Sequence, residues 1–306
     1  MKTKKIVASF LLLFISALWG GSFVAQSKGG ELVGPLTYGF LRFFVAGVAV
    51  LPLLKLIDRA AETQNSKPKN KKDLIVGGVL CGFFLAGTSA FQQLGLAMGT
   101  SSGKAGFLTA CNVIFVPIIS LFFKNKIKLN VWLGVVITVV GLYFLCLNGD
   151  MTVQLSDILV LICSVMNAAR IVTVDRFMNK TDTAKLACIQ FFSASLMLLV
   201  ISLIFEADSF SVWFESFKQG ALWLTLLYSG VLAGAVAFTV QIVAQKQINP
   251  TVSSILMSTE SVFAVLAGVI IVHETLTVRE LIGCATVFVA LIVSQLSFNN
   301  KRKARV

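Results

Sequence analysis

Long blocks of apolar residues alternate along the chain with short polar and charged segments. A helix that crosses a lipid bilayer needs about 20 mostly apolar residues, because each residue rises about 1.5 Å and the hydrocarbon core is about 30 Å thick. By this measure the sequence predicts ten membrane-spanning helices, and therefore an all-α polytopic membrane protein. The predicted spans are Ile6–Gln26, Pro35–Ile57, Leu74–Met98, Gly103–Phe123, Val131–Leu147, Ser156–Arg176, Ala184–Phe205, Ala221–Gln245, Thr251–Val272 and Arg279–Phe298.

The composition agrees with membrane spans and excludes an ordinary soluble enzyme with one buried core. Of the 306 residues, 57% are hydrophobic and only 13% are charged, whereas a soluble domain carries about 25% charged residues. The first apolar block follows three lysines, so a cleavable signal peptide is an alternative interpretation of it. The length of the block and its segment Trp19–Phe23, a poor cleavage site, favour a permanent first span.

The distribution of basic residues predicts the orientation of the chain. The formal net charge is +12, but the basic residues lie in short loops and not on one amphipathic face, which argues against nucleic acid as a partner. With a cytoplasmic amino terminus, 18 basic residues lie on the inner side and 3 on the outer side. Basic loops resist translocation. We therefore expect a protein of the cell membrane (inner or plasma membrane), in contact with the lipid bilayer, with both termini cytoplasmic.

The residues that usually carry catalysis or metal binding are scarce. Six cysteines lie inside apolar stretches, and the chain has a single histidine, His273. This set forms neither a secreted disulfide framework nor a paired-cysteine metal site. The segment Gly99–Ala105 is one residue short of a phosphate-binding loop, and His273-Glu274 lacks the second histidine of a zinc-protease helix. We therefore expect no enzyme, no metal site and no cofactor.

A single shift of 148 residues brings the two halves of the chain into register. Phe107–Phe115 then matches Ile255–Phe263, and the segment from Pro35 to Phe44 matches residues 183–192. We predict two units of five spans each, at residues 1–147 and 148–306. Because five is odd, the second unit enters the membrane from the opposite side, and the two repeats are inverted. In transporters of this architecture, the substrate site lies near the midplane of the bilayer, between the repeats.

Motifs in both units resemble those of a known family. They are Trp19–Phe23, Leu41–Phe43, Gly103–Leu108 and Asn112–Pro117 in the first unit, and Glu260–Ala264 and His273–Thr277 in the second. In this order, over nearly the whole chain, they are similar to the drug/metabolite transporter superfamily, EamA type. The resemblance implies a ten-helix transporter of two five-helix repeats that exports small metabolites, often amino acids. The chain departs from the family pattern at Ser261, where proline is common, and at Lys124–Lys126, where Gly-Glu-Arg is usual.

Ionisable residues inside the predicted spans are the first candidates for function. Such a group costs about 2.5–3.5 kcal/mol at the bilayer centre, so it lines a cavity or has a partner. Glu260 lies about ten residues into its span and could bind a proton or form a fixed ion pair. Arg42 could bind a substrate carboxylate or lock to Glu260. Arg170 could contact substrate, pair with Asp175 or extend to the inner surface, and Lys104 is expected at the solvated mouth of its span.

Uncharged polar residues and one tryptophan complete the predicted site. Trp19 is expected to face a central cavity, because Gly20 and Gly21 beside it permit close backbone approach. Its counterpart in the second repeat is Asn167, and the counterpart of Glu260 is Asn112. Helix packing is the alternative role for each of these side chains. The predicted substrate-binding residues are Trp19, Arg42, Gln92, Asn112, Asn167 and Gln241, with Glu260 as the predicted proton-coupling residue.

Glycine and proline positions predict how the spans pack. Glycines four residues apart allow close helix contacts, and Pro117 and Pro250 are expected to bend or start helices. The glycine pairs are Gly78/Gly82, Gly95/Gly99 and Gly230/Gly234.

The leading hypothesis is a gradient-driven secondary transporter that exports amino acids or similar small-molecule substrates by alternating access. A multidrug or nucleotide-like metabolite transporter of the same fold is one alternative. A non-transporting membrane sensor or assembly protein is another, although the longest loop, of about 16 residues, is too short for a soluble output domain. The sequence leaves monomer and homodimer both open.

Overall fold

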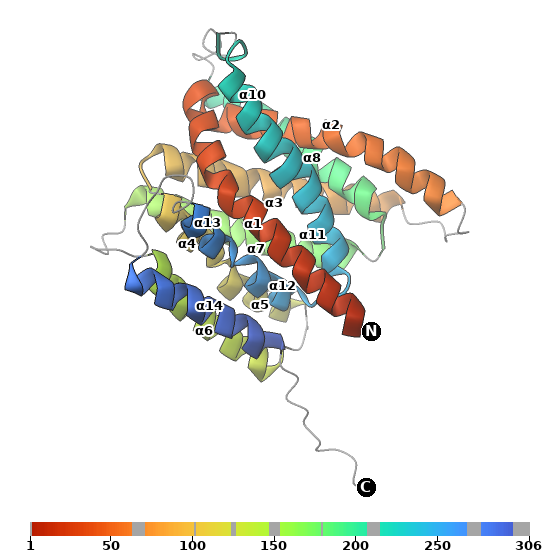
Figure 1. The fold of residues 1–306 in the computed structure, drawn as a ribbon. Helices are drawn as coiled ribbons and strands as arrows, with labels where there is room; N and C mark the ends of the chain where they lie inside the picture. The colour runs from red at the N-terminus through yellow and green to blue at the C-terminus, as the bar shows by residue number, and fades with distance from the viewer. Residues whose placement is uncertain are drawn as a thin grey trace.

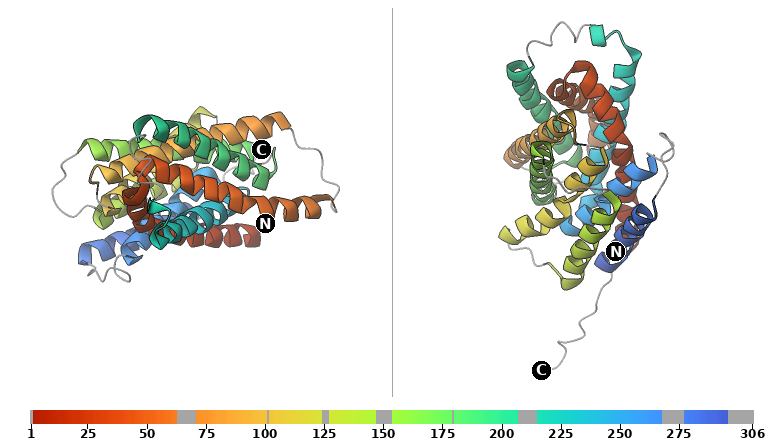
Figure 2. Two further views of the ribbon diagram at one scale, coloured as in Figure 1. Left: turned by 90° about the horizontal axis from the view of Figure 1, so that it is seen from above. Right: turned by 90° about the vertical axis from the view of Figure 1, so that its left-hand side faces the viewer.

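The computed structural model describes residues 2–62, 71–100, 102–123, 127–146, 154–178, 180–206, 215–267 and 277–295. Within these ranges the protein is helical and contains no strand. The helices pack side by side into one bundle, with α6 and α14 paired along one edge (Figure 1). Seen from above, most helices run along one common direction, as the spans of a membrane protein do (Figure 2).

The described helices form ten rods in the order that the sequence predicts. The first half contains α1 (Lys2–Val33), α2 (Pro35–Glu62), α3 (Lys71–Ala97), α4 (Ser102–Ala110), α5 (Asn112–Phe122) and α6 (Leu129–Cys146). The second half contains α7 (Leu155–Phe177), α8 (Thr183–Phe205), α10 (Gly220–Leu226), the π-helical segment η2 (Leu227–Val236), α11 (Ala237–Gln245), α12 (Pro250–Met257), α13 (Glu260–Ala267) and α14 (Val278–Gln295). The elements α10, η2 and α11 follow one another without a gap and make one rod, whereas α4–α5 and α12–α13 are rods with a break.

The rods agree with a polytopic membrane protein. Among the described residues, seven helical segments are long and apolar enough to cross a membrane, and two shorter apolar segments lie at Leu129–Phe144 and Leu281–Ser294. Large apolar side chains also cover the outside of the bundle, such as Phe10 (67% exposed) and Phe14 (56% exposed). Such a surface suits contact with lipid. The ends of three predicted spans, at Leu147, at residues 268–272 and at residues 296–298, lie outside the described residues.

The two broken rods are interrupted at equivalent places. In the first, α4 ends at Ala110 and α5 begins at Asn112. In the second, α12 ends at Met257 and α13 begins at Glu260. Asn112 and Glu260 are 148 residues apart, which is the shift that aligns the repeats. The sequence repeat therefore has a structural counterpart in which each half contributes one discontinuous helix.

Local hydrogen bonding accounts for both breaks. The Cys111 N–H is shared between the carbonyls of Phe107 (3.1 Å) and Leu108 (3.3 Å), and the Ile114 N–H bonds to the Cys111 carbonyl three residues back. At the second break, the hydroxyls of Ser258 and Thr259 donate to the carbonyls three residues before them, each at 2.7 Å. Side chains that bond to nearby carbonyls compete with the regular helical ladder and bend it. As predicted, Pro250 starts a helix, α12, and the structure adds Asn249 as its N-cap.

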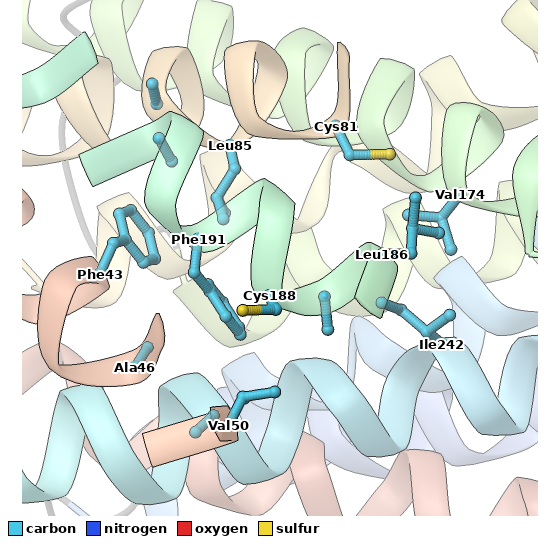
Figure 3. Packing of buried hydrophobic residues seen from close by; sticks show 14 of the residues in the cluster. Phe43, Ala46, Val50, Cys81, Leu85, Val174, Leu186, Cys188, Phe191 and Ile242 are labelled. Carbon is cyan, nitrogen blue, oxygen red and sulfur yellow. The ribbon is translucent and has the colours of Figure 1, made fainter. Parts of the chain in front are cut away.

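Helices of one half pack mainly against helices of the other half. In the bundle α3 lies against α7 and α8, and the equivalent rod of the second half, α10–η2–α11, lies against α1 and α2. The helices α2 and α8 pair with each other, as do α6 and α14. The buried apolar cluster around Phe43, Leu85 and Phe191 joins α2, α3 and α8 across this boundary (Figure 3).

The predicted glycine contacts are present at five of the six positions. A Cβ atom on Gly82 would lie 2.9 Å from the Gln190 carbonyl oxygen, and one on Gly230 would lie 3.0 Å from the Arg42 carbonyl oxygen. Gly78, Gly95 and Gly234 also face a neighbouring helix. For Gly99 the prediction was wrong, because nothing lies within 4 Å of its virtual Cβ. Gly99 has φ of 100° and serves the left-handed turn that ends α3.

A carboxylate ties α8 to the start of α2. The Glu206 side chain, at the C-terminal end of α8, accepts hydrogen bonds from the backbone N–H groups of Leu36 (2.9 Å) and Thr37 (2.8 Å) and from the Thr37 hydroxyl (2.6 Å). Gly34 makes this approach possible, because a Cβ there would lie 2.7 Å from Glu206 Oε2. An acidic side chain at a helix N-terminus satisfies free N–H groups and interacts favourably with the helix dipole.

Candidate functional site

A small cavity lies in the middle of the bundle, with walls from both halves of the chain. Its space for the centres of water-sized molecules is about 70 Å³, which is room for a few waters or a small solute. Six of the seven predicted site residues line it, namely Trp19, Arg42, Gln92, Asn112, Asn167 and Glu260. Gln241 does not line the cavity and instead lies behind Arg170, which does.

Arg170, on α7, is a cation with only 1% of its surface exposed. Its Nη2 atom donates to Asn167 Oδ1 (3.3 Å) and Gln241 Oε1 (3.0 Å). The guanidinium carbon lies 4.7 Å from the centre of the Phe238 ring. A guanidinium has five N–H donors, and Nε and Nη1, which carry three of them, have no partner among the described residues. Arg170 therefore lines the cavity and keeps three buried donors without a partner in the described chain, and it neither extends to the inner surface nor pairs with Asp175.

Arg42, on α2, lines the same cavity and is 8% exposed. Its Nη2 atom donates to Ser89 Oγ at 3.1 Å, and its guanidinium carbon lies 4.5 Å from the centre of the Phe43 ring. In the described part of the chain its Nε atom has no partner. Arg42 is not locked to Glu260, so its charge remains open to a bound anion.

Glu260 is the first residue of α13 and is 7% exposed. Its carboxylate makes no ion pair with any residue that the structure describes. The ionisable groups that interact with it electrostatically at longer range are Arg170 and Cys163, both on α7. The position at a helix N-terminus favours its negative charge. The fixed ion pair, which was one alternative for this residue, is therefore absent from the described structure.

Asn112 and Gln92 supply uncharged polar groups to the wall. Asn112 is 2% exposed, and its Oδ1 atom has no hydrogen-bond partner within the described ranges. Gln92 Nε2 donates to Thr109 Oγ1 at 3.2 Å, and both residues line the cavity. The cavity wall thus contains hydrogen-bond acceptors at the two helix breaks, from Asn112 on α5 and Glu260 on α13. It also contains hydrogen-bond donors, from Arg42 and Arg170.

Aromatic rings form an apolar part of the site. Trp19 lies 5.0 Å from Phe238 between ring centres, and Phe238 packs edge-on against Phe43 (6.4 Å) and Phe191 (5.8 Å). The Trp19 Nε1–H donates to the carbonyl of Ala233 at 2.8 Å. Trp19 therefore faces the cavity with its ring and uses its polar atom to hold α1 against η2.

Several wall residues had no place in the sequence prediction. They include small hydroxyl side chains that continue the polar surface, namely Ser22, Thr88, Ser89, Thr109 and Ser229. Isolated serines and threonines are common in apolar helices, where they bond to their own backbone, so only the repeat pattern could have indicated which of them face inward. Arg170 was weighed in the sequence but not included among the predicted site residues. The side chain of Lys104 lies outside the described residues.

Comparisons with known proteins agree over nearly the whole chain. The model of the EamA-like transporter family matches residues 7–147 and 154–295. An uncharacterized transporter of Archaeoglobus fulgidus is 28% identical over 294 residues, which are 96% of this chain and 87% of that protein. The uncharacterized transporter YoaV of Bacillus subtilis is 25% identical over 297 residues, which are 95% of this chain and 97% of that protein.

The fold is also found among solved structures. One crystal structure superposes with a TM-score of 0.73 over 95% of this chain and 98% of the other, at 17% sequence identity. At this identity the likeness concerns the arrangement of the helices alone.

Proposed function

The chain belongs to the EamA-like transporter family, and from this premise we propose that it is a secondary transporter that exports amino acids or chemically similar small metabolites by alternating access. The observation that carries the proposal is the central cavity. Charged groups of both signs line it, as Arg42, Arg170 and Glu260, in a space of about 70 Å³ between the two halves. Buried charges of this kind are costly in a membrane protein unless they serve a substrate or ion pathway.

The chemistry of the wall suits a small solute with a carboxylate. Guanidinium groups bind carboxylates through paired, charge-assisted hydrogen bonds, and both arginines have N–H groups without a partner among the described residues. Glu260 and the Oδ1 atom of Asn112, which has no partner in the described part of the chain, can accept hydrogen bonds from an ammonium or hydroxyl group. The rings of Trp19 and Phe238 offer an apolar surface for the remainder of the solute.

The packing of the bundle supports access from one side at a time. Toward the end of the bundle where the chain starts, a buried apolar cluster joins α1, α5, α7 and α12, and Leu12, Ile15 and Ile255 are among its fully buried members. The polar residues of the wall lie farther along α1, at Ser22 and Gln26. If the apolar packing formed at the other end of the bundle in its place, the cavity would become accessible from the opposite side, and a solute would cross the membrane as in other inverted-repeat transporters.

Proton coupling is the finer part of the proposal, and Glu260 is its residue. A carboxylate that lines the cavity and has no ion pair among the described residues can take up and release a proton as the cavity changes access. The ionisable groups that act on it from the described helices are Arg170 and Cys163. We also propose a cell-membrane location with both termini in the cytoplasm, because basic residues prevail in the loops on that side.

The test is counterflow in proteoliposomes that contain the purified protein. Vesicles are preloaded with unlabelled amino acids, organic acids, nucleosides or lipophilic cations, and the entry of a labelled member of each class is followed. We expect exchange of carboxylate-bearing solutes, and loss of this exchange in Arg42→Ala. Exchange of lipophilic cations or nucleosides alone would replace the proposed cargo. Absence of any exchange by folded, inserted protein would favour a non-transporting role.

A further inference from the structure

We propose that the cargo carries a net negative charge, that its carboxylate binds Arg170, and that Gln241 positions the Arg170 guanidinium for this contact. This inference rests on the proposed transport function and narrows its substrate class.

The charged side chains in the described cavity wall do not balance. Arg42 and Arg170 contribute two positive charges and the ionised form of Glu260 one negative charge, which leaves an excess of one positive charge, or of two when Glu260 has taken up a proton. An uncompensated charge away from water is strongly unfavourable. A zwitterion leaves the excess unchanged, whereas a solute with a net charge of −1 removes or lowers it. The cavity is therefore suited to an acidic amino acid or an organic acid more than to a neutral amino acid.

Arg170 is better placed than Arg42 to hold the carboxylate. Arg170 is 1% exposed and has three buried N–H groups, on Nε and Nη1, without a partner in the described chain, whereas Arg42 is 8% exposed and has one such buried group, on Nε. Two acceptors, Asn167 and Gln241, both bind Nη2 of Arg170, so one corner of the guanidinium is fixed. A fixed planar guanidinium loses little entropy when it binds a carboxylate.

Gln241 holds Arg170 from behind and does not reach the cavity. Its Oε1 atom accepts from Arg170 Nη2 at 3.0 Å, and its Nε2 atom lies 3.3 Å from Met257 Sδ. Gln241 is fully buried, and it lies on α11 opposite the arginine of α7. Its counterpart in the first repeat, Gln93, has no arginine partner, and its Nε2 atom is unpartnered among the described residues. The Arg170–Gln241 pair is therefore a feature of one repeat and not a requirement of the repeated fold.

The experiment compares solutes that differ in charge but hardly in shape. Purified protein is titrated with aspartate and asparagine, with glutamate and glutamine, and with lactate and lactamide. Binding is read from the shift of the thermal unfolding temperature, because a ligand that binds only the folded state stabilises it. Transport is read separately from competition in counterflow. We expect at least one anion to bind at least about tenfold more tightly than its neutral counterpart, since a hydrogen-bonded charge contributes that much.

The variants separate charge, geometry and folding. Arg170→Gln is expected to weaken anion binding at least about tenfold, and Arg170→Lys to restore it only in part, because lysine lacks the planar fork. Gln241→Leu is expected to raise KM with a smaller effect on kcat. Gln241→Glu keeps the acceptor but cancels the excess charge, so it is expected to abolish the preference of aspartate over asparagine. Arg176→Gln, at the end of α7 and against Phe123, is the matched control and is expected to behave as wild type.

Each outcome has a defined meaning. Equal binding of the anions and their neutral counterparts, or unchanged anion binding in folded Arg170→Gln, overturns the inference. If the wild type exchanges neutral or cationic solutes in preference, transport stands and this inference fails. If anions raise the unfolding temperature of the wild type but not of Arg170→Gln, and no solute exchanges, the binding site stands and the transport function fails. If Arg170→Gln does not fold, the Gln241→Glu comparison decides.

Discussion

Asn112 and Glu260 occupy the same position in the two broken rods, each as the first residue of the helix that resumes after the break. Both side chains line the central cavity, and they are 148 residues apart, as the sequence repeat requires. One is a neutral amide and the other a carboxylate. The two halves thus share the same helix break but differ in the side chain that follows it. Only the second half can therefore carry a titratable charge at this position.

This difference predicts the effect of removing the charge. We expect Glu260→Gln to lose the acceleration of transport by a proton gradient and to keep exchange between equal solute pools, because the amide preserves shape but cannot release a proton. Uptake with and without an imposed pH difference is the measurement. Asn112→Gln, at the equivalent position, is the control and is expected to keep the response. Full pH-driven transport by Glu260→Gln would rule out its role in coupling.

Arg42 predicts a dependence on the charge of the cargo. We expect Arg42→Gln to reduce counterflow of carboxylate-bearing solutes at least about tenfold, because it removes a charge-assisted contact. A lipophilic cation is expected to be affected far less. Ser89→Ala, which removes only the hydroxyl that accepts from Arg42, is expected to have an effect of about two- to tenfold. An equal loss for cations and anions would indicate that Arg42 serves the structure alone.

The close contact between α1 and α13 at Gly20 predicts that a larger side chain at this position destabilises the protein. A Cβ atom on Gly20 would lie 2.6 Å from the Glu260 carbonyl oxygen and 2.7 Å from the Ala264 backbone nitrogen. Since backbone cannot move aside as a side chain can, we expect Gly20→Ala to destabilise the protein by about 1–3 kcal/mol. Thermal unfolding measures this. Gly220→Ala, where nothing lies within 4 Å, is expected to be neutral, and an equal loss in both would contradict the packing argument.

The hydrogen bonds of Glu206 between α8 and α2 predict that removal of its carboxylate lowers the stability of the protein. Glu206→Ala removes the acceptor of three hydrogen bonds, from Leu36, Thr37 and the Thr37 hydroxyl, and is expected to cost about 1–3 kcal/mol of stability. The comparison is Glu215→Ala. Glu215 forms an ion pair with Lys218 at 2.7 Å, but both side chains are more than 70% exposed, so its loss is expected to cost at most about 1 kcal/mol.

The proposed orientation predicts which residues are reached from outside. Lys4, near the start of α1, and Lys218, just before α10, are both exposed. In a chain without its native cysteines, we expect a membrane-impermeant maleimide to label Lys218→Cys in intact cells. Labelling of Lys4→Cys is expected only after the membrane is permeabilised. The reverse pattern would invert the orientation.

The sequence predicts the rods well because hydropathy and helix length are properties of contiguous residues. The predicted span Ser156–Arg176 and the observed α7, Leu155–Phe177, differ by one residue at each end. The breaks were not predicted, because they depend on local hydrogen bonds: a shared backbone N–H at Cys111 in the first, and hydroxyl groups of Ser258 and Thr259 that bond to nearby carbonyls in the second. The sequence alone does not distinguish a serine or threonine whose hydroxyl bonds to a nearby carbonyl from one whose hydroxyl does not.

The site was predicted in part for a related reason. Glu260, Arg42 and Asn112 stand out because polar groups are costly in a membrane, and all three line the cavity. Burial cost alone cannot tell which residue faces a solute and which stands behind it. The prediction therefore differs from the structure at two residues. Gln241 was predicted to line the cavity but lies behind its wall, whereas Arg170 was not among the predicted residues but lines the cavity. That distinction depends on helix rotation, which packing across the two halves determines.

The pairing of helices across the two halves has a consequence for how the chain can be divided. Since α3 packs on α7 and α8, and α1 on the α10–η2–α11 rod, each half leaves its largest inner faces to be covered by the other. We expect residues 1–150 or 151–306 produced alone to be degraded, and the two fragments produced together to reassemble. We therefore expect the covalent link between the two halves to be dispensable for assembly, because contacts between helices of different halves hold the bundle together.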